Sequence, residues 1–333
     1  EMDGPDGRAL QTLAAQTCRF WNNRAIRHGA FEEYYPYENG YPPLAFSTHA
    51  VAHLCRKGVI APSEIRKGLV NATRQLAARF EQQASNQQIA GTAALAVIHD
   101  SVPDLIGDED LNRIVNMTLD LQTVDGWFPE YDGPDLGYLS VSLDCLWDIY
   151  DMTNDSRVLS SIESAFDFMA WFVLGPLGRA GMLNSRNTDY IVPYGISRIA
   201  SGGAAGVEKA KAVLHKLFGE AEIEGHWLLA VDDRYWCHYI GHSFLRALIA
   251  LSDLKCTDGK IGIKSEYSLL PSRQHFSGYT FIRDTHRFSP EAVVATRKGG
   301  IFTAVWPSGQ RVSDYGWIVQ TGKDQFVSHW WSP

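Results

Sequence analysis

The sequence has no long apolar run and no block of like charges. No stretch of eighteen apolar residues occurs, so we expect no segment that spans a membrane. The net charge of −8 is spread along the chain, which argues against the basic surface that nucleic-acid binding requires. DNA and RNA are therefore not expected as partners.

Cysteine is also scarce in this chain. The five cysteines are widely separated, at Cys18, Cys55, Cys145, Cys237 and Cys256. An odd and dispersed set predicts reduced core residues rather than a disulfide framework or a metal site. The first residues, Glu1 to Arg8, do not resemble a signal peptide. Both features favour a cytoplasmic location over a periplasmic one.

What the chain does contain is a long series of helical patterns. With 45% hydrophobic residues it can bury a large core. Apolar residues recur at helical spacing from Gly7 to about Lys255, between loops rich in Gly, Pro, Asn and Asp. We expect helices near 8–28, 46–57, 63–84, 87–99, 108–121, 137–151, 156–173, 190–200, 205–217 and 233–254. Such a series predicts either a bundle or a closed ring of helical hairpins.

Three long aromatic connections favour the ring. They cover 29–45, 122–136 and 176–190, and one follows about every second helix. Long connections on one face are typical of an (α/α) toroid with a substrate cleft. We therefore predict a mainly α fold with a toroid of catalytic type over 1–257, and loops 29–45 and 122–136 on the same rim.

After Asp258 the pattern changes to short β-branched or aromatic runs. We expect strands at Lys264–Leu270, Tyr279–Asp284, Ala292–Thr296, Gly300–Trp306, Gln310–Gln320 and Gln325–Trp331. This predicts a short antiparallel, strand-rich segment over 258–333. It is short for a supporting β-sandwich, so we expect either a truncated chain or a sheet that packs on the toroid.

The first candidate site is the loop Phe31–Tyr41, which concentrates acids and tyrosines between two helices. Glu33 and Tyr35 are candidate acid–base groups. Glu38 and Asn39 are candidate substrate contacts. The alternative is a packed interhelical loop whose tyrosines belong to the core.

The second candidate is Gln122–Asp132, which repeats the combination of acids, aromatic residues and proline. Trp127 and Tyr131 could stack on a pyranose, because aromatic faces bind sugar rings. Glu130 and Asp132 could hydrogen-bond the sugar hydroxyls. The alternative is a loop kinked at glycine, in which Trp127 is a hydrophobic plug.

A third polar loop, 184–190, is followed by Tyr194. Asn184 is a candidate substrate contact, and Arg186 could hold a substrate carboxylate in a fork. Tyr194 is a candidate catalytic acid. A surface ion pair is the alternative role for Arg186.

The fourth candidate is the start of the last predicted helix. Its catalytic candidate is His238, since imidazole titrates near neutral pH. Candidate substrate contacts on the same segment are Asp233, Arg234 and His242.

Two histidine pairs have the spacing of zinc ligands. His238 and His242 share one helix face, and so do His49 and His53. Pairs at i and i+4 suit zinc. There is no HExxH motif and no third carboxylate at fixed spacing, so we expect histidines of the core or the cleft, with no metal ligand and no cofactor.

Three of these stretches resemble a known family. Phe31–Pro36 with Ala45–Thr48, the phrase Asp125–Tyr131 and the opening Asp232–Tyr235 resemble the helical domain of heparinase II/III-like proteins. That group includes members associated with bacterial surface polysaccharides. Arg297–Gly300 resembles the start of their C-terminal β domain.

The resemblance implies polysaccharide lyase chemistry on an oligo- or polysaccharide substrate. Such an enzyme removes the proton beside a uronate carboxylate and then eliminates the glycosidic oxygen. It needs a group that neutralises the carboxylate, a base and an acid, for which the candidates are Asn39, Arg234, His238, Tyr35 and Tyr194. The chain departs from the family in its short β region and in its many acidic residues.

Those acids support a first alternative, a glycoside hydrolase on the same toroid. Its paired carboxylates would be Glu33 or Glu38 with Glu130 or Asp132. A second alternative is a terpene-cyclase-like protein, because Gln122–Trp127 is one residue short of the QxxDGxW phrase of triterpene cyclases. A third is a non-catalytic glycan-binding protein.

Overall fold

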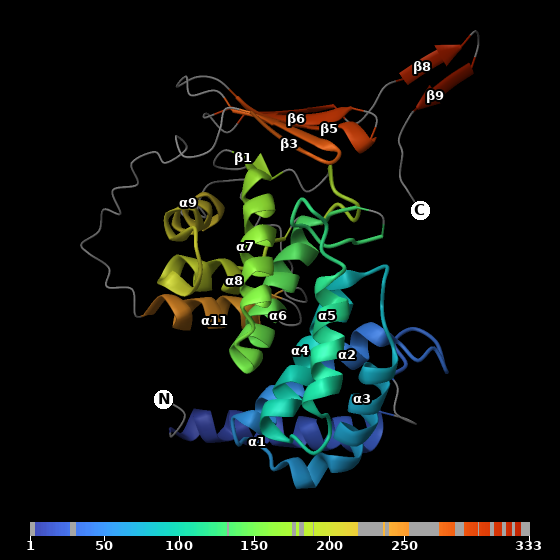
Figure 1. The fold of residues 1–333 in the computed structure, drawn as a ribbon, viewed down its shortest axis with the longest axis vertical. Coiled ribbons are helices and arrows are strands. Elements are labelled where there is room, and N and C mark those ends of the chain that lie inside the picture. The colour runs from blue at the N-terminus through green and yellow to red at the C-terminus, as the bar shows by residue number, and fades with distance from the viewer. Residues whose placement is uncertain are drawn as a thin grey trace. The chain divides into compact units, whose positions relative to one another are not determined.

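The computed structural model describes most of the chain. The described residues are 4–26, 31–131, 133–174, 178–179, 183–188, 190–218, 236, 240–252, 273–283, 290–298, 300–306, 310–314, 318–321 and 324–327. They form a mainly helical protein with an antiparallel sheet near the C-terminus (Figure 1). This confirms the predicted order of helices followed by strands, whereas the toroid stays a prediction.

The chain divides into two compact units. The first comprises Glu1–Gln122 and Cys145–Leu159, and the second comprises Thr123–Asp144 and Ser160–Pro333. Loop 29–45 belongs to the first unit and almost all of loop 122–136 to the second, so a rim shared by the two loops stays a prediction. The predicted boundary at 257 lies outside the described residues.

Helices are the main secondary structure in the described part of the first unit. They are α1 (Pro5–Phe20), continued by a π-turn at Trp21–Ala25, α2 (Tyr41–Arg56), a 3₁₀ turn at Pro62–Ile65, α3 (Arg66–Ala78), α4 (Ser85–Ser101), α5 (Asp108–Leu119) and the second half of α6 (Leu136–Thr153). Two helix boundaries of this unit differ from prediction, because α2 begins at Tyr41 rather than near 46 and α3 ends at Ala78 rather than near 84. Prolines 42 and 43 occupy the first turn of α2, where a missing N–H costs no helical hydrogen bond.

Helix α4 is the core of the first unit. Every residue from Gln88 to Ile98 is buried, as expected for a helix that is apolar on all sides. Its small side chains allow close approach: a Cβ at Gly91 would lie 2.5 Å from the Tyr41 hydroxyl. That hydroxyl donates to Oε1 of Gln88 at 3.1 Å, and its burial raises the pKa of Tyr41 well above the usual range.

The second unit combines helices with all of the described strands. Its helices are the first half of α6, α7 (Ser156–Trp171, from Ser160 on), α8 (Tyr194–Arg198), continued by a π-turn at Ile199–Gly203, α9 (Val207–Phe218) and α11 (Gly241–Ser252). Its main sheet is an antiparallel meander of β3 (Arg273–Phe276), β4 (Tyr279–Ile282), β5 (Glu291–Ala295), β6 (Ile301–Val305) and β7 (Arg311–Asp314). The unit also contains two separate two-stranded sheets. One pairs β1 (Val173–Leu174) with β2 (Gly178–Arg179), and the other pairs β8 (Ile318–Thr321) with β9 (Asp324–Val327).

The main sheet packs on the end of α7 through aromatic rings. Phe168 contacts Phe276 with ring centroids 5.0 Å apart, and Phe172 contacts Phe281 at 4.8 Å. Arg283 donates to the carbonyl of Trp171 at 3.3 Å, which satisfies an acceptor at the last turn of α7. The sheet therefore packs against helices of its own unit.

The strand predictions agree in part. Strands β4 and β6 fall within predicted runs, and β5 and β9 each begin one residue before theirs, whereas Lys264–Leu270 lies outside the described residues. Gln310–Gln320 is wrong as a single run, because β7 and β8 belong to different sheets. Strand β3 was not predicted: its residues have little β-branched character, and the turn at Gly278, with φ of 94°, pairs it with β4.

Two further properties concern the described residues. No helix among them is both long enough and apolar enough to cross a membrane. Cys18, Cys55 and Cys145 are buried free thiols, and burial, with a smaller contribution from nearby Cys18, raises the pKa of Cys55 to about 11.

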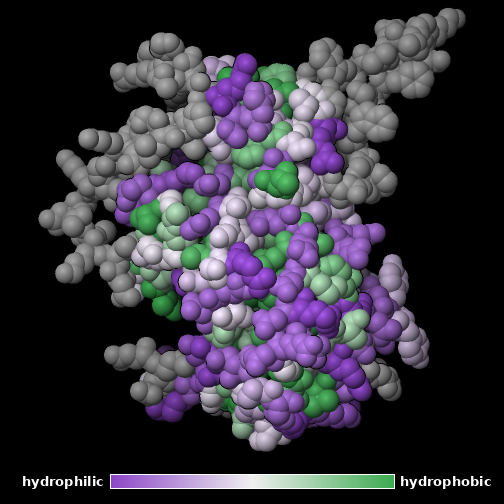
Figure 2. Space-filling view, in the orientation of Figure 1, coloured by the Kyte–Doolittle hydropathy of each residue, from purple (hydrophilic) through white to green (hydrophobic). Residues whose placement is uncertain are grey.

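Figure 2 shows one face of the surface, on which hydrophilic side chains predominate and hydrophobic ones form small separate groups.

Candidate functional site

Asp135 organises a polar region of the second unit. It is 1% exposed and precedes α6, where its Oδ1 accepts the backbone N–H of Tyr138 at 3.2 Å, as a helix N-cap does. Its Oδ2 accepts the backbone N–H groups of Arg186 and Thr188 at 3.1 and 3.3 Å, and the Thr188 hydroxyl makes a short hydrogen bond to Oδ1. These four donors compensate the buried carboxylate and fix loop 183–188 to the start of α6.

Close backbone approach strengthens this attachment. The N–H of Ser185 donates to the carbonyl of Pro134 at 2.9 Å, and the N–H of Gly137 donates to the Thr188 hydroxyl at 2.9 Å. A Cβ at position 137 would collide with the Thr188 hydroxyl and lie 2.8 Å from the Thr188 Cβ. Glycine is therefore required at the first turn of α6, because the loop lies directly against it.

Five side chains around this attachment form a cluster that we call the Arg186 patch. They are Glu130, Tyr131, Tyr138, Arg186 and Tyr190. The Arg186 guanidinium lies over the Tyr131 ring, 4.6 Å from its centroid, and is close enough to the Tyr138 phenol to influence its ionisation. The rings of Tyr138 and Tyr190 meet edge to face with centroids 6.3 Å apart. Arg186 is exposed, the three tyrosines are partly exposed and Glu130 is buried. The patch thus presents one cation and three phenols.

Burial determines the charge state of Tyr138. It raises the pKa of the phenol, and the nearby Asp135 and Glu130 carboxylates add to this effect. Arg186 opposes them by its charge, but the net direction is upward. Tyr138 is therefore protonated at neutral pH and suited to donate a proton rather than to remove one.

A strained turn holds Tyr131 in place. The backbone N–H of Glu130 donates to the carbonyl of Gly133 at 2.7 Å, and Tyr131 between them has a φ of 52°. This left-handed conformation is uncommon for an aromatic residue and costs about 1 kcal/mol or more. It places the ring of Tyr131 under the guanidinium of Arg186.

Two predicted contacts in this region have different roles. Trp127 is 5% exposed and packs against Phe168 with centroids 6.3 Å apart, so its indole is a core plug and not an open face for a sugar. Asn184 is fully buried, so its side chain is not at the surface either. Glu130, 1% exposed, influences the patch through its charge rather than as an exposed sugar ligand.

The loop at 31–40, in the first unit, keeps the predicted tyrosines exposed. Tyr35 is 72% exposed, and Glu33 is also at the surface. Glu38 has a structural role: its Oε2 accepts the backbone N–H groups of Glu33 and Tyr34 at 2.9 and 2.8 Å, and these bonds hold its pKa below the usual range. Glu38 is therefore held as a carboxylate that closes the loop, and its role as a substrate contact stays a prediction. Asn39 has a φ of 55°, and its carbonyl accepts a hydrogen bond from an arginine.

Tyr194, a predicted acid, is 7% exposed in the second unit. Arg198 donates to its hydroxyl at 2.8 Å, and the guanidinium of Arg246 lies 3.6 Å from its ring centroid. This phenol is enclosed by two arginines, so it is not an accessible proton donor. His242 is exposed on α11. Four other candidates lie outside the described residues: Asp132, Asp233, Arg234 and His238.

Asp135, Tyr138 and Tyr190 were not predicted. Asp135 had a sequence signal, because an aspartate just before the apolar start of a helix is a typical N-cap. Tyr138 follows three residues later and so lies in the first turn, close to the capped end. Tyr190 had no separate signal, since its contact with Tyr138 depends on how loop 183–188 folds back.

Comparison of the chain with family models, with curated proteins and with solved structures gives no match. The resemblance to heparinase II/III-like proteins therefore stays a prediction.

Proposed function

We propose that the chain is a carbohydrate-active enzyme of the polysaccharide lyase type, which cleaves a uronate-containing glycan at the Arg186 patch. The observation that carries this proposal is the contact between Arg186 and Tyr138, which joins an exposed cation to a protonated phenol. A lyase needs these two groups side by side, because it must bind a carboxylate and protonate a leaving oxygen.

Arg186 is suited to the carboxylate. Its planar guanidinium can donate two parallel hydrogen bonds to a carboxylate, and the pairing withdraws charge from it. The proton on the adjacent carbon then becomes easier to remove, because the developing negative charge is stabilised. The Tyr131 ring beneath the guanidinium restricts its orientation and leaves its outer edge for a ligand.

Tyr138 is suited to the leaving group. A base takes the proton beside the carboxylate, its electron pair forms a carbon–carbon double bond, and the glycosidic carbon–oxygen bond breaks. The departing oxygen takes the proton of Tyr138, a phenol that is protonated at neutral pH and whose pKa burial raises further above the usual value near 10. The partly exposed rings of Tyr131 and Tyr190 supply apolar faces for the sugar. The candidate for the base is His238, as proposed from the sequence.

The patch favours elimination over hydrolysis. A glycoside hydrolase needs two carboxyl groups that reach the bond from opposite sides. Among the described residues of this region, Glu130 and Asp135 are each 1% exposed, and Asp135 accepts four hydrogen bonds from the loop and the helix. Neither is placed to act on an exposed glycan.

The test is a screen of the purified chain against polyuronates and uronate-containing glycosaminoglycans. We expect a product that absorbs in the ultraviolet, since elimination leaves a double bond conjugated to the carboxylate. New reducing ends without that absorbance would select the hydrolase instead. Binding without turnover would select a non-catalytic glycan-binding protein.

A further inference from the structure

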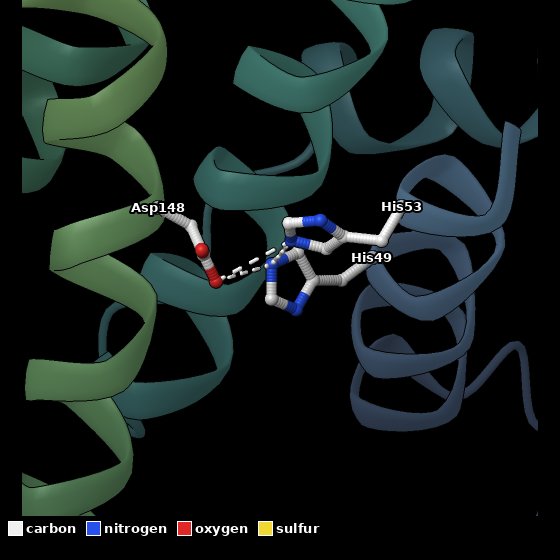
Figure 3. Close-up of side chains that lie close together, drawn as sticks. All are labelled: His49, His53 and Asp148. Carbon is white, nitrogen blue, oxygen red and sulfur yellow. Dashed lines mark hydrogen bonds and ion pairs between the residues drawn. The ribbon is translucent and has the colours of Figure 1, made fainter. Parts of the chain in front are cut away.

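Two histidines of α2 and one aspartate of α6 converge in the first unit (Figure 3). Nε2 of His49 lies 3.0 Å from Oδ2 of Asp148, and Nε2 of His53 lies 3.4 Å from the same oxygen. The two Nε2 atoms are 3.1 Å apart. Three atoms that are typical metal ligands thus form a small triangle.

The dimensions of this triangle match a metal site. Ligands about 2.0–2.1 Å from a tetrahedral zinc ion lie about 3.3 Å from one another, and adjacent ligands of an octahedral ion lie about 3.0 Å apart. The observed spacings of 3.0, 3.1 and 3.4 Å span these two values. His49 and His53 are one helical turn apart, which brings both rings to the same face of α2.

Hydrogen atoms alone satisfy this triangle poorly. A carboxylate only accepts, and each Nε2 carries at most one hydrogen. If both imidazoles are protonated at Nε2, two N–H groups 3.1 Å apart point at one oxygen. If only one is, its N–H can donate to the other nitrogen or to the carboxylate, and the second nitrogen still has its lone pair close to an anionic oxygen. A cation at the centre interacts favourably with all three atoms.

Burial strengthens this argument. The side chain of Asp148 is only 3% exposed, and those of His49 and His53 are 13% and 28% exposed. A buried carboxylate is stabilised by a fixed cation, because little water is available to solvate it. The partial exposure of His53 leaves a route for an ion to enter.

The described residues offer a contrast in His99 and Asp108. Nε2 of His99 lies 3.1 Å from Oδ1 of Asp108, and its Nδ1 is 2.9 Å from the carbonyl oxygen of Ile106. This is an ordinary histidine with one partner on each nitrogen. In the part of the chain that the structure describes, only His49, His53 and Asp148 form a group of three such ligands within 4.8 Å.

We propose that His49, His53 and Asp148 bind one divalent transition-metal ion through Nε2, Nε2 and Oδ2, with at least one position open to water or another ligand. Two imidazoles and one carboxylate are the ligand set of many zinc sites and of mononuclear iron(II) sites. This revises the sequence-based expectation of no metal ligand. That expectation rested on the lack of a third carboxylate at fixed spacing, and α6 supplies one from a distant part of the chain.

The test uses the full chain, stripped of metal with a chelator and then given one equivalent of zinc or of cobalt(II). We expect one zinc ion per chain after gel filtration, measured by elemental analysis, and a higher midpoint of thermal unfolding. Bound cobalt should give strong visible absorption if four-coordinate and weak absorption if six-coordinate, which separates the zinc-like site from the iron-like one.

Variants identify the ligands. His49→Ala, His53→Ala and the isosteric Asp148→Asn should each weaken zinc binding more than about tenfold, the least that loss of even an outer-shell partner costs. His99→Ala is the matched control and should bind zinc like the parent chain. Far-ultraviolet circular dichroism checks that Asp148→Asn is folded. Failure of the stripped parent chain to bind stoichiometric zinc, or undiminished binding in the three ligand variants, would overturn the proposal.

Discussion

The guanidinium of Arg186 lies on the ring of Tyr131, 4.6 Å from its centroid, although Tyr131 has a strained φ of 52°. The strain persists because backbone hydrogen bonds fix the chain at Arg186 and around Tyr131. Asp135 accepts the backbone N–H of Arg186, and Glu130 closes the turn that contains Tyr131. A cation fixed in this way loses little side-chain entropy when it binds an anion.

The first prediction concerns Arg186. Arg186→Ala should lower kcat/KM for an identified uronate glycan by about 10²-fold, because the substrate carboxylate loses a charge-assisted pair of hydrogen bonds. Arg186→Lys should recover only part of this loss, since an ammonium group cannot form the fork or stack on Tyr131. Arg113→Ala, at an exposed arginine of α5 that pairs with Asp110, is the control and should change the kinetics little.

The second prediction concerns Tyr138. Tyr138→Phe removes only the hydroxyl and should lower kcat by about 10²-fold or more, with KM nearly unchanged. Burial raises the pKa of this phenol above its usual value near 10, so its protonated, active form persists throughout the neutral range. The pH profile of the parent enzyme should accordingly show no loss of kcat from this group below about pH 10. A tyrosine acid whose ionisation stops turnover near pH 8 would contradict the assignment.

The third prediction tests the attachment of loop 183–188. Asp135→Ala removes the cap of α6 and leaves three partly buried N–H groups without their acceptor, so it should lower the free energy of unfolding by about 2 kcal/mol or more. Asp110→Ala removes an exposed aspartate from the first turn of α5 and should cost no more than about 0.5 kcal/mol. Urea unfolding of both variants measures the difference. Equal losses in the free energy of unfolding would show that Asp135 stabilises the fold no more than an exposed aspartate does.

The fourth prediction follows from Lys216. Its Nζ lies 3.2 Å from Oε2 of Glu291, and its side chain is almost buried. Burial lowers the pKa of Lys216 to about 7, because it outweighs the attraction of Glu291. Below pH 7 both the folded and the unfolded chain hold this proton. Between pH 7 and about 10 the unfolded chain holds more of it, so this group makes the free energy of unfolding rise with pH, by at most about 1.4 kcal/mol per pH unit.

Lys216→Met removes this contribution. The free energy of unfolding of the parent chain, minus that of the variant, should rise from pH 7 to pH 10 and stay flat from pH 5 to pH 6.5. Lys211→Met, at a more exposed lysine that pairs with Glu208, is the control and should show no such rise. A difference that is independent of pH would mean that Lys216 titrates normally in the folded state.

Much of the secondary structure could be predicted from the sequence, because it depends on local pattern. The spacing of apolar side chains predicts α4, α5, α6 and α7, with bounds that differ by no more than a few residues from those in the structure. The start of α2 was missed because two prolines suggested a loop, although proline fits the first turn of a helix. Strand β3 was missed because it is defined by its hairpin partner rather than by its own residues.

The candidate site could be predicted only in part, because it depends on contacts between distant segments. Arg186 and Tyr131 were proposed as substrate contacts from loop composition, but their stacking arises from loop 183–188 folding onto the start of α6. Trp127 belongs to a loop whose composition is typical of sugar binding, yet its side chain fills the core beside Phe168. The partner of His49 and His53 is Asp148, and no spacing in the sequence relates two helices that meet only in the folded chain.

If the Arg186 patch cleaves a glycan by elimination, every cut leaves one unsaturated end and one new reducing end. The decisive experiment counts both in one digest of a uronate glycan, the unsaturated ends by ultraviolet absorbance and the new reducing ends by chemical labelling. We expect equal numbers of the two from the parent chain, and both reduced about 10²-fold with Tyr138→Phe while circular dichroism shows a folded protein. Reducing ends that appear without unsaturated ends, or full activity in Tyr138→Phe, would contradict elimination at this patch.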